Sequence, residues 1–160
     1  MDKLHLIAAA AALGLAAATP AAAKVNVIQS ASPALSRGSS FAWAPVPARG
    51  FGVPDPRIAN EVTADRLRAL TEITLTNKGY QQIADASQAD LLVAYTIVIV
   101  PEADAGQLGT QGTLVLDLIE RGSGRLVWRA TSEKQVTGKD VSQEKLTALL
   151  RQMTKSLPAR

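Results

Sequence analysis

Apolar and polar residues alternate most regularly between positions 112 and 136, which read GTLVLDLIERGSGRLVWRATSEKQV. A period of two residues is typical of strands with one buried face, and two such runs flank Gly122 and Gly124 here. A glycine in the connection can adopt the positive φ that a tight hairpin turn requires. The pattern therefore predicts a β-hairpin with one apolar face. The residues of that face are Leu114, Leu116, Leu118, Leu126, Trp128 and Ala130.

The segment before this hairpin, residues 90–100, reads DLLVAYTIVIV and is apolar on both faces. Such a run is typical of a strand in the middle of a sheet, covered above and below. Shorter alternating segments at 24–29 and 40–44, with an extended segment at 80–83, predict small strands near the start of the domain. The long segment and the hairpin together predict a three-stranded meander.

Two segments have the helical period. The first starts at Asp55 and Pro56, an N-cap acceptor followed by proline at the first helical position, and it stops at Gly79. Residues 71–76, TEITLT, alternate like a strand, but the apolar stripe continues through them and favours a helix. We expect this stripe to face the sheet. It comprises Ile58, Val62, Ala69, Leu70 and Ile73.

The second helical segment runs from Asp140 to Leu157. Asp140 and Gln143 have the spacing of a capping box, and Pro158 closes the segment. Its apolar stripe is the clearest helical signal in the chain. The stripe comprises Leu146, Leu149, Leu150, Met153 and Leu157.

Together these elements predict an α+β fold. Its antiparallel β-sheet has a three-stranded central meander plus short N-terminal strands. Two amphipathic helices need an apolar sheet face to cover, so we expect both α-helices on one face of this sheet.

Residues 1–23, MDKLHLIAAAAALGLAAATPAAA, precede this domain and have the pattern of a secretory signal peptide. Lys3 supplies a positive start, an apolar run follows, and Ala21 to Ala23 provide the small residues of a cleavage site. The apolar run before Pro20 has about 15 residues, whereas a membrane-spanning helix needs roughly 20. We therefore expect a single domain at residues 24–160, with no transmembrane helix after cleavage.

Missing residue types exclude several kinds of chemistry. The chain has no cysteine, and its single histidine, His5, lies in the predicted signal peptide. Histidine-assisted nucleophiles, histidine-based metal sites and disulfides are therefore excluded from the predicted domain, and we expect no metal or other cofactor. No cysteine is available to carry the lipid of a bacterial lipoprotein. We expect a soluble protein in the periplasm of a Gram-negative bacterium.

The charge pattern argues against nucleic acid as a partner. The net charge is +3, and removal of Lys3 and Asp2 with the signal peptide leaves it unchanged. Basic residues are scattered along the chain, whereas nucleic-acid binding favours clusters on one face. A solvated surface accounts for this pattern better.

Four stretches of the chain, in this order, carry a family resemblance: SFAWAP, DPRIANEVTADRLRALTEITLTNKGYQQ, QADLLVAYTI and GTLVLDLIERGSGRLVWRA. They cover nearly the whole predicted domain and resemble the domain-of-unknown-function 4136 family of bacterial envelope proteins. The resemblance implies a periplasmic or outer-membrane-associated α+β protein without assigned catalytic residues. Many members have a cysteine at the cleavage point, and this chain departs from them there. The matching residues are Phe41, Trp43, Lys78, Gly79, Tyr80, Ala89, Asp90, Leu91, Gly112, Thr113, Leu114, Gly124, Val127, Trp128 and Arg129.

Aromatic residues beside a proline-rich segment form the first candidate site. Phe41 and Trp43 lie on one side of a predicted strand, and Phe51 follows within the proline-rich stretch. An exposed groove of such rings would accept a peptide or an acyl chain. The alternative is that these rings pack against the sheet edge as part of the core.

The predicted outer face of the sheet is the second candidate site. We expect Val115, Ile119 and Val127 on this face, together with Arg129. An open apolar sheet face is either covered or associates with a partner. The simplest account of Asp117 is a cross-strand ion pair with Arg129, worth about 0.2–1 kcal/mol. A catalytic pair would need a second carboxylate nearby, and the sequence indicates none.

Two features of the hairpin resemble binding motifs but have simpler structural interpretations. Residues 122–124, GSG, precede a strand rather than the helix that a phosphate-binding loop requires, which favours a turn. Trp128 has arginines nearby, as a base-stacking platform would, but it shares its face with Leu126 and Ala130. Core packing is the favoured interpretation for this indole.

These observations favour a non-enzymatic binding or structural module of the cell envelope, whose partner is another envelope protein or an apolar ligand. The alternative is a carrier or sensor of amphiphiles, with the ligand between the helices and the sheet. A carboxylate-based hydrolase ranks last. The sequence specifies neither the partner nor the oligomeric state.

Overall fold

The computed structural model describes residues 24–36, 38–45, 61–102, 109–134 and 142–158. The predicted signal peptide, Ile58, the Asp55-Pro56 helix start, Phe51 and Asp140 lie outside these residues. The strands are Lys24–Gln29 (β1), Ser40–Trp43 (β2), Gln81–Gln82 (β3), Leu91–Glu102 (β4), Gly109–Glu120 (β5) and Arg125–Lys134 (β6). The helices are Glu61–Asn77 (α1) and Gln143–Met153 (α2), and a 3₁₀ turn, Thr154–Ser156 (η1), follows α2.

The six strands form one mixed sheet in the order β1-β6-β5-β4-β2-β3. Strands β4, β5 and β6 form the predicted antiparallel meander, and β1 pairs antiparallel with β6. Strand β2, however, runs parallel to both β4 and β3. The prediction of a purely antiparallel sheet is therefore wrong. Helix α1 lies between β2 and β4 in the chain, and a helical crossover of this kind returns the chain in the same direction.

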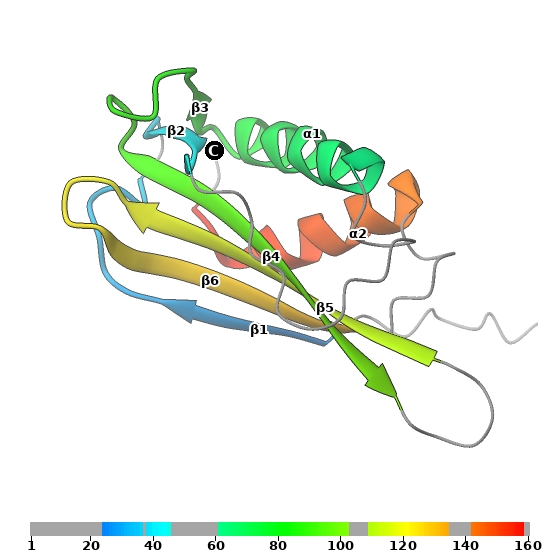
Figure 1. The fold of residues 1–160 in the computed structure, drawn as a ribbon. Coiled ribbons are helices and arrows are strands. Elements are labelled where there is room, and N and C mark those ends of the chain that lie inside the picture. Colours follow the sequence, from blue (N-terminus) through cyan, green and yellow to red (C-terminus); the bar gives the residue numbers. More distant parts are fainter. Residues whose placement is uncertain (1–23, 37, 46–60, 103–108, 135–141, 159–160) are drawn as a thin grey trace, which may run out of the picture.

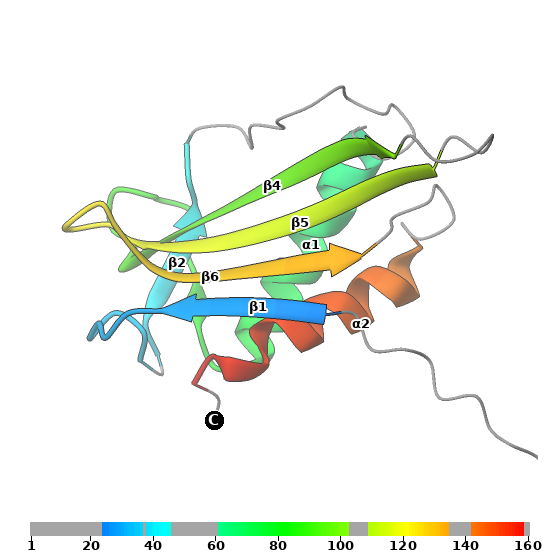
Figure 2. The same cartoon turned by 90° about the horizontal axis from the view of Figure 1, so that it is seen from below.

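Both helices lie on one side of the sheet (Figure 1), and the view from below shows the strands with the helices behind them (Figure 2). The prediction that two helices cover one face is confirmed. The prediction that the strand before the hairpin is covered on both faces is not confirmed, because no element among the described residues covers the opposite face. Strand β4 is nevertheless central, since it pairs with β5 on one side and with β2 on the other.

The hairpin supplies the centre of the core. Its apolar face lies beneath the helices, and Trp128 has no exposed surface, so the core interpretation of this indole is confirmed. The indole Nε1 donates to Ser156 Oγ at 3.2 Å, which satisfies its one polar group where the chain leaves α2. Gly124 lies in the turn with a φ of 67°, which is the positive value predicted for a glycine in this connection. The buried apolar residues of the hairpin are Leu114, Leu116, Leu118, Val127, Trp128 and Ala130.

A β-bulge exchanges two of the predicted positions. The β5–β6 register shifts between Leu118 and Ile119, so that Leu118 pairs with Trp128 but Ile119 pairs with Leu126. Val127 is the extra residue and is buried in the core, whereas Leu126 is half-buried on the other face. The prediction that Val127 lies on the outer face and Leu126 in the core is therefore wrong. An inserted residue breaks the alternation by one position, which an unbroken period of two cannot anticipate.

The predicted core stripe of α1 is also wrong. Val62 and Ile73 are 65% and 57% exposed, and of the described stripe residues Leu70 alone is buried. The face of α1 that packs on the sheet is instead a mixture of leucines and threonines. Threonine can enter the core because its hydroxyl bonds within the helix: Thr74 Oγ1 donates to Leu70 O at 2.6 Å. The buried residues are Thr63, Leu67, Leu70, Thr71, Thr74 and Leu75.

Helix α2 follows its predicted pattern more closely. All five residues of the expected stripe are buried, from Leu146 to Leu157. The N-cap is Ser142, whose hydroxyl accepts from the backbone N–H of Lys145 at 3.4 Å. Helix α1 ends as predicted near Gly79, which adopts φ 97°. The stop signal of α1 therefore holds. Helix α2 is shorter than predicted at both ends, because it begins at Gln143 and ends at Met153, where η1 follows, instead of continuing to Leu157.

Alanine substitutions on α1 test which of its faces is buried. We expect Leu67→Ala to lower the free energy of unfolding by about 2–5 kcal/mol, because Leu67 is 2% exposed. Ile73→Ala removes a similar side chain from the exposed face and should change stability by less than about 0.5 kcal/mol. Urea denaturation of both variants measures the difference. Equal losses would show that Ile73 packs on the sheet.

Candidate functional site

The sheet face opposite the helices is hereafter called the open face. Its side chains alternate along β1, β4 and β5 with those that face the helices, and the bulge at Val127 interrupts this alternation along β6. Most of them are half-buried, but the three on β1 are exposed, with Ile28 at 66%, and Ala42 on β2 is buried. The open face comprises Lys24, Asn26 and Ile28 from β1, Ala42 from β2, Leu92, Ala94 and Thr96 from β4, Thr113, Val115, Asp117 and Ile119 from β5, and Leu126, Arg129 and Thr131 from β6.

An ion pair lies at the centre of the open face. Asp117 and Arg129 are direct partners in the β5–β6 register. Arg129 Nε donates to Asp117 Oδ1 at 2.7 Å, and Nη2 donates to Oδ2 at 2.7 Å. The predicted cross-strand pair is thus confirmed and is bidentate, and the carboxylate raises the pKa of the Arg129 guanidinium above its ordinary value. The Arg129 side chain is 41% exposed, and that of Asp117 is 14% exposed.

Aliphatic side chains surround this pair. The strand register places Ile28, Arg129, Asp117 and Ala94 in one row across four strands. Val115 and Ile119 flank Asp117 along β5, as expected for this face. Ile28 and Leu126 were missed by sequence reasoning, since Ile28 depends on the β1–β6 register and Leu126 on the bulge. Neither feature leaves a local signal in the sequence.

The first candidate site is not an exposed aromatic groove. Phe41 has no exposed surface, because β2 pairs with both β3 and β4 and carries Phe41 into the core. Trp43 is half-buried, and its Nε1 donates to Glu72 Oε1 on α1 at 2.6 Å. The Arg68 guanidinium lies 4.9 Å from the centre of the Trp43 ring. Phe41 and Trp43 therefore attach β2 to α1 and the core, and the alternative interpretation holds for them.

Strand β2 is held in place by a carboxylate at its start. Asp90 Oδ2 accepts from the Ser40 backbone N–H at 2.7 Å and from Ser40 Oγ at 2.8 Å. The Ser40 hydroxyl also accepts from the Asp90 N–H at 3.0 Å. These hydrogen bonds to Ser40 lower the pKa of Asp90, with a further contribution from Arg121. Asp90 has a structural role, which matches its predicted position at a strand entry.

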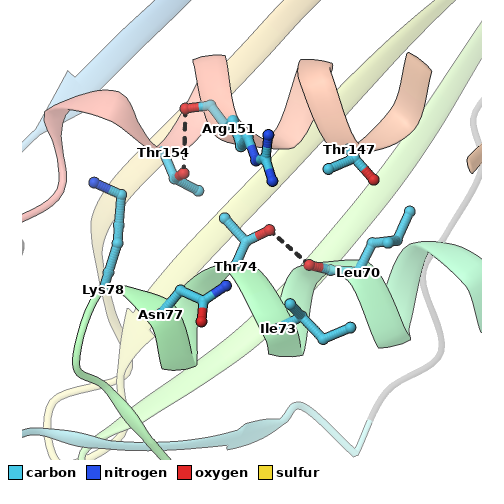
Figure 3. Close-up of a pocket in the computed structure, with 8 residues that line it drawn as sticks. All are labelled: Leu70, Ile73, Thr74, Asn77, Lys78, Thr147, Arg151 and Thr154. Atoms are coloured by element: carbon cyan, nitrogen blue, oxygen red, sulfur yellow. Dashed lines mark hydrogen bonds between the residues drawn. The ribbon is translucent and has the colours of Figure 1, made fainter. Parts of the chain in front are cut away.

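Two cavities lie along the helices. The first has a volume of about 160 Å³ and lies between α1 and α2, where Ile73 and Thr74 of α1 and Thr147 and Arg151 of α2 line it, with Lys78 at one end (Figure 3). Lys78 Nζ donates to Leu157 O at 3.2 Å and so ties the two helix ends together. The second, of about 510 Å³, is lined along α2 and contains Glu144 as its one acidic residue. Neither cavity brings two carboxylates together, as a carboxylate-based hydrolase would require.

The described residues form neither a cluster of metal ligands nor a membrane-spanning helix. No group of three or more His, Cys, Asp or Glu side chains there is placed to hold a metal ion. The helices in this part of the chain are too short or too polar to span a bilayer.

The sequence matches one protein-family model, described as "Domain of unknown function (DUF4136)", over residues 25–159. The match covers almost all of the predicted domain. This chain belongs to that family. No curated protein matches the sequence.

Solved structures share this fold at low sequence identity. A PelC dodecamer from Paraburkholderia phytofirmans is 19% identical with a TM-score of 0.54, covering 86% of this chain and 99% of that one. A DUF4136 family protein from Bacteroides thetaiotaomicron is 12% identical with a TM-score of 0.52, covering 84% of this chain and 96% of that one. A PDZ domain protein from Parabacteroides distasonis is 14% identical with a TM-score of 0.55, covering 86% of this chain and 35% of that one.

Substitution of Asp90 should destabilise the fold in a pH-dependent way. Because its pKa is lowered in the folded state, ionised Asp90 stabilises the fold above its unfolded pKa of about 4, and this contribution is lost as the pH falls below that value. We expect Asp90→Asn to unfold at a lower urea concentration than the wild type at pH about 7, with a smaller difference at pH about 3. Glu144→Gln, on the exposed side of α2, is the matched control. A difference that does not depend on pH would contradict this role of Asp90.

Proposed function

We propose that this protein is a non-enzymatic module of the cell envelope that acts by binding another protein through the open face. The observation that carries the proposal is the position of both helices on one side of a six-stranded sheet. The other side presents half-buried aliphatic residues around the Asp117–Arg129 pair. A sheet of this size with one apolar face uncovered by the described elements is a docking surface in physical terms.

The chemistry of the described residues supports binding rather than catalysis. The carboxylates with the strongest contacts have structural partners: Asp117 binds Arg129, Asp90 binds Ser40, and Glu72 binds the Trp43 indole. Glu120 accepts from Ser32 Oγ at 2.6 Å and from Ser123 Oγ, and these bonds lower its pKa. A carboxylate that is fully engaged in this way is a poor general base.

A protein partner is favoured over an amphiphile. An amphiphile carrier would hold its ligand between helices and sheet, where the described residues instead form a packed core that contains Trp128, Leu116 and Leu150. The PelC structures that share the fold are dodecamers. In that protein, the fold is therefore compatible with assembly of several copies.

The cellular location is part of the proposal. Residues 1–23 have the pattern of a signal peptide, and the absence of cysteine leaves no site for a lipid anchor. Export followed by cleavage would place the domain in the periplasm. There the open face would meet another envelope protein.

Site-specific photocrosslinking in cells tests the proposed surface. A photoreactive amino acid replaces Val115 on the open face or, as the matched control, Ala148 on the exposed side of α2. We expect a reproducible protein adduct from position 115 and much less from position 148. Equal yields from the two positions, or a position-115 product that contains no second protein chain, would refute the proposed interface.

A further inference from the structure

We propose that the partner on the open face is a second copy of this chain, packed face to face about a two-fold axis. Arg129 of each copy then contacts Asp117 of the other. This inference rests on the proposed function and names the partner for that surface. The geometry of the central ion pair carries it.

The ion pair has unused hydrogen-bonding capacity. A guanidinium has five N–H donors, and Arg129 uses one on Nε and one on Nη2 to bind Asp117. Each Asp117 oxygen accepts one of these bonds and retains a further lone pair. The Arg129 side chain is 41% exposed, so part of it is accessible from the open side of the sheet. A partner that supplies a carboxylate at this point would complete the pair.

The charge arrangement is complementary to itself. One positive and one negative group lie side by side on neighbouring strands of a sheet face. Consider a two-fold axis that lies in the interface, parallel to the strands and midway between the two groups. Rotation by 180° about this axis places the positive group of one copy over the negative group of the other. Two-fold contacts are reciprocal in this sense, so that residue i meets j and j meets i. A patch of one sign would repel its own copy, whereas this pair attracts it.

The surrounding residues suit a dry contact. Ile28 and Ala94 lie at the ends of the row that contains the pair. Val115 and Ile119 lie on either side of Asp117 along β5, on the same face. Two sheets pack about 10 Å apart with interdigitated side chains, so the aliphatic residues would exclude water from the centre. Removing an ion pair from water is costly unless its remaining groups are hydrogen-bonded. The reciprocal arrangement supplies those bonds from both copies.

A charge-exchange experiment tests this register. The double variant Asp117→Arg/Arg129→Asp retains an internal ion pair, and two of its copies can still form the reciprocal contact. In a mixed dimer, however, Arg129 of the wild type faces arginine at position 117, and Asp117 faces aspartate at position 129. We expect dimers of wild type and dimers of the variant. Mixed dimers should be at least about tenfold below the statistical yield, which corresponds to about 1.4 kcal/mol.

Native mass spectrometry of ¹⁵N-labelled wild type mixed with unlabelled variant measures this yield. Statistical mixing would overturn the reciprocal contact, and so would a wild type that stays monomeric at about 1 mM, a concentration that detects even weak association. In that last case, a position-115 crosslink to a different protein would leave the proposed function intact. If the position-115 crosslink also fails, both proposals fall.

A second pair of variants guards against a double variant that does not fold. Val115→Lys places an unpaired charge on the open face, and Ala148→Lys places the same residue on the exposed side of α2. We expect the first variant to be monomeric and the second to dimerise like the wild type, with circular dichroism confirming that both are folded. Dimerisation of Val115→Lys at wild-type strength would overturn the face-to-face arrangement.

Discussion

Burial of one face of the β5–β6 hairpin beneath two helices is the contact on which the rest of the structure depends. Trp128 and its neighbouring leucines fill the space under α2, while Leu67 and Leu75 bring α1 onto the same side. A fully buried side chain of this size contributes about 1.5–3 kcal/mol through removal of apolar surface from water. No other part of the described chain gathers as many such side chains. The β5–β6 hairpin is therefore scaffold.

The parallel placement of β2 follows from the same contact. Because α1 must lie on the helix side of the sheet, the chain leaves β2, forms α1, and returns along the same edge to pair β4 beside β2. The Asp90–Ser40 bonds and the Trp43–Glu72 bond then attach β2 to the strand and to the helix that follow it. Because both helices lie on one side of the sheet, the opposite side is formed by the residues of the open face, most of which are half-buried.

Local periodicity predicted the elements of this fold well and their orientation less well. The hairpin, the long strand and the stripe of α2 were predictable because a period of 2.0 or 3.6 residues is a property of each segment alone. The outward position of Val62 and Ile73 was not, because threonines can replace aliphatic residues at a helix contact once their hydroxyls bond the helix backbone. The bulge at Val127 and the parallel pairing of β2 depend on contacts between segments distant in sequence.

The candidate site shows the same division. The Asp117–Arg129 pair was predictable because hairpin strands bring opposite residues together, and Val115 and Ile119 follow from alternation with the buried leucines. Ile28 and Leu126 were not predictable, since each depends on a register that no local pattern encodes. Phe41 and Trp43 were ambiguous in the sequence because aromatic residues suit both cores and grooves. Because β2 pairs with two strands, Phe41 and Trp43 pack in or against the core.

An ion pair in the middle of an aliphatic face limits how that face can be used. Leucines at positions 117 and 129 would pack as well within one sheet, but they would accept a partner in many rotations and registers. In the proposed face-to-face dimer, a shift by two residues along the strands would put an aliphatic side chain over the guanidinium. Its remaining donors would then be buried without acceptors, at about 1–3 kcal/mol each. The pair therefore adds little to the stability of one domain, and in the proposed dimer its effect would be to select one orientation of the second copy.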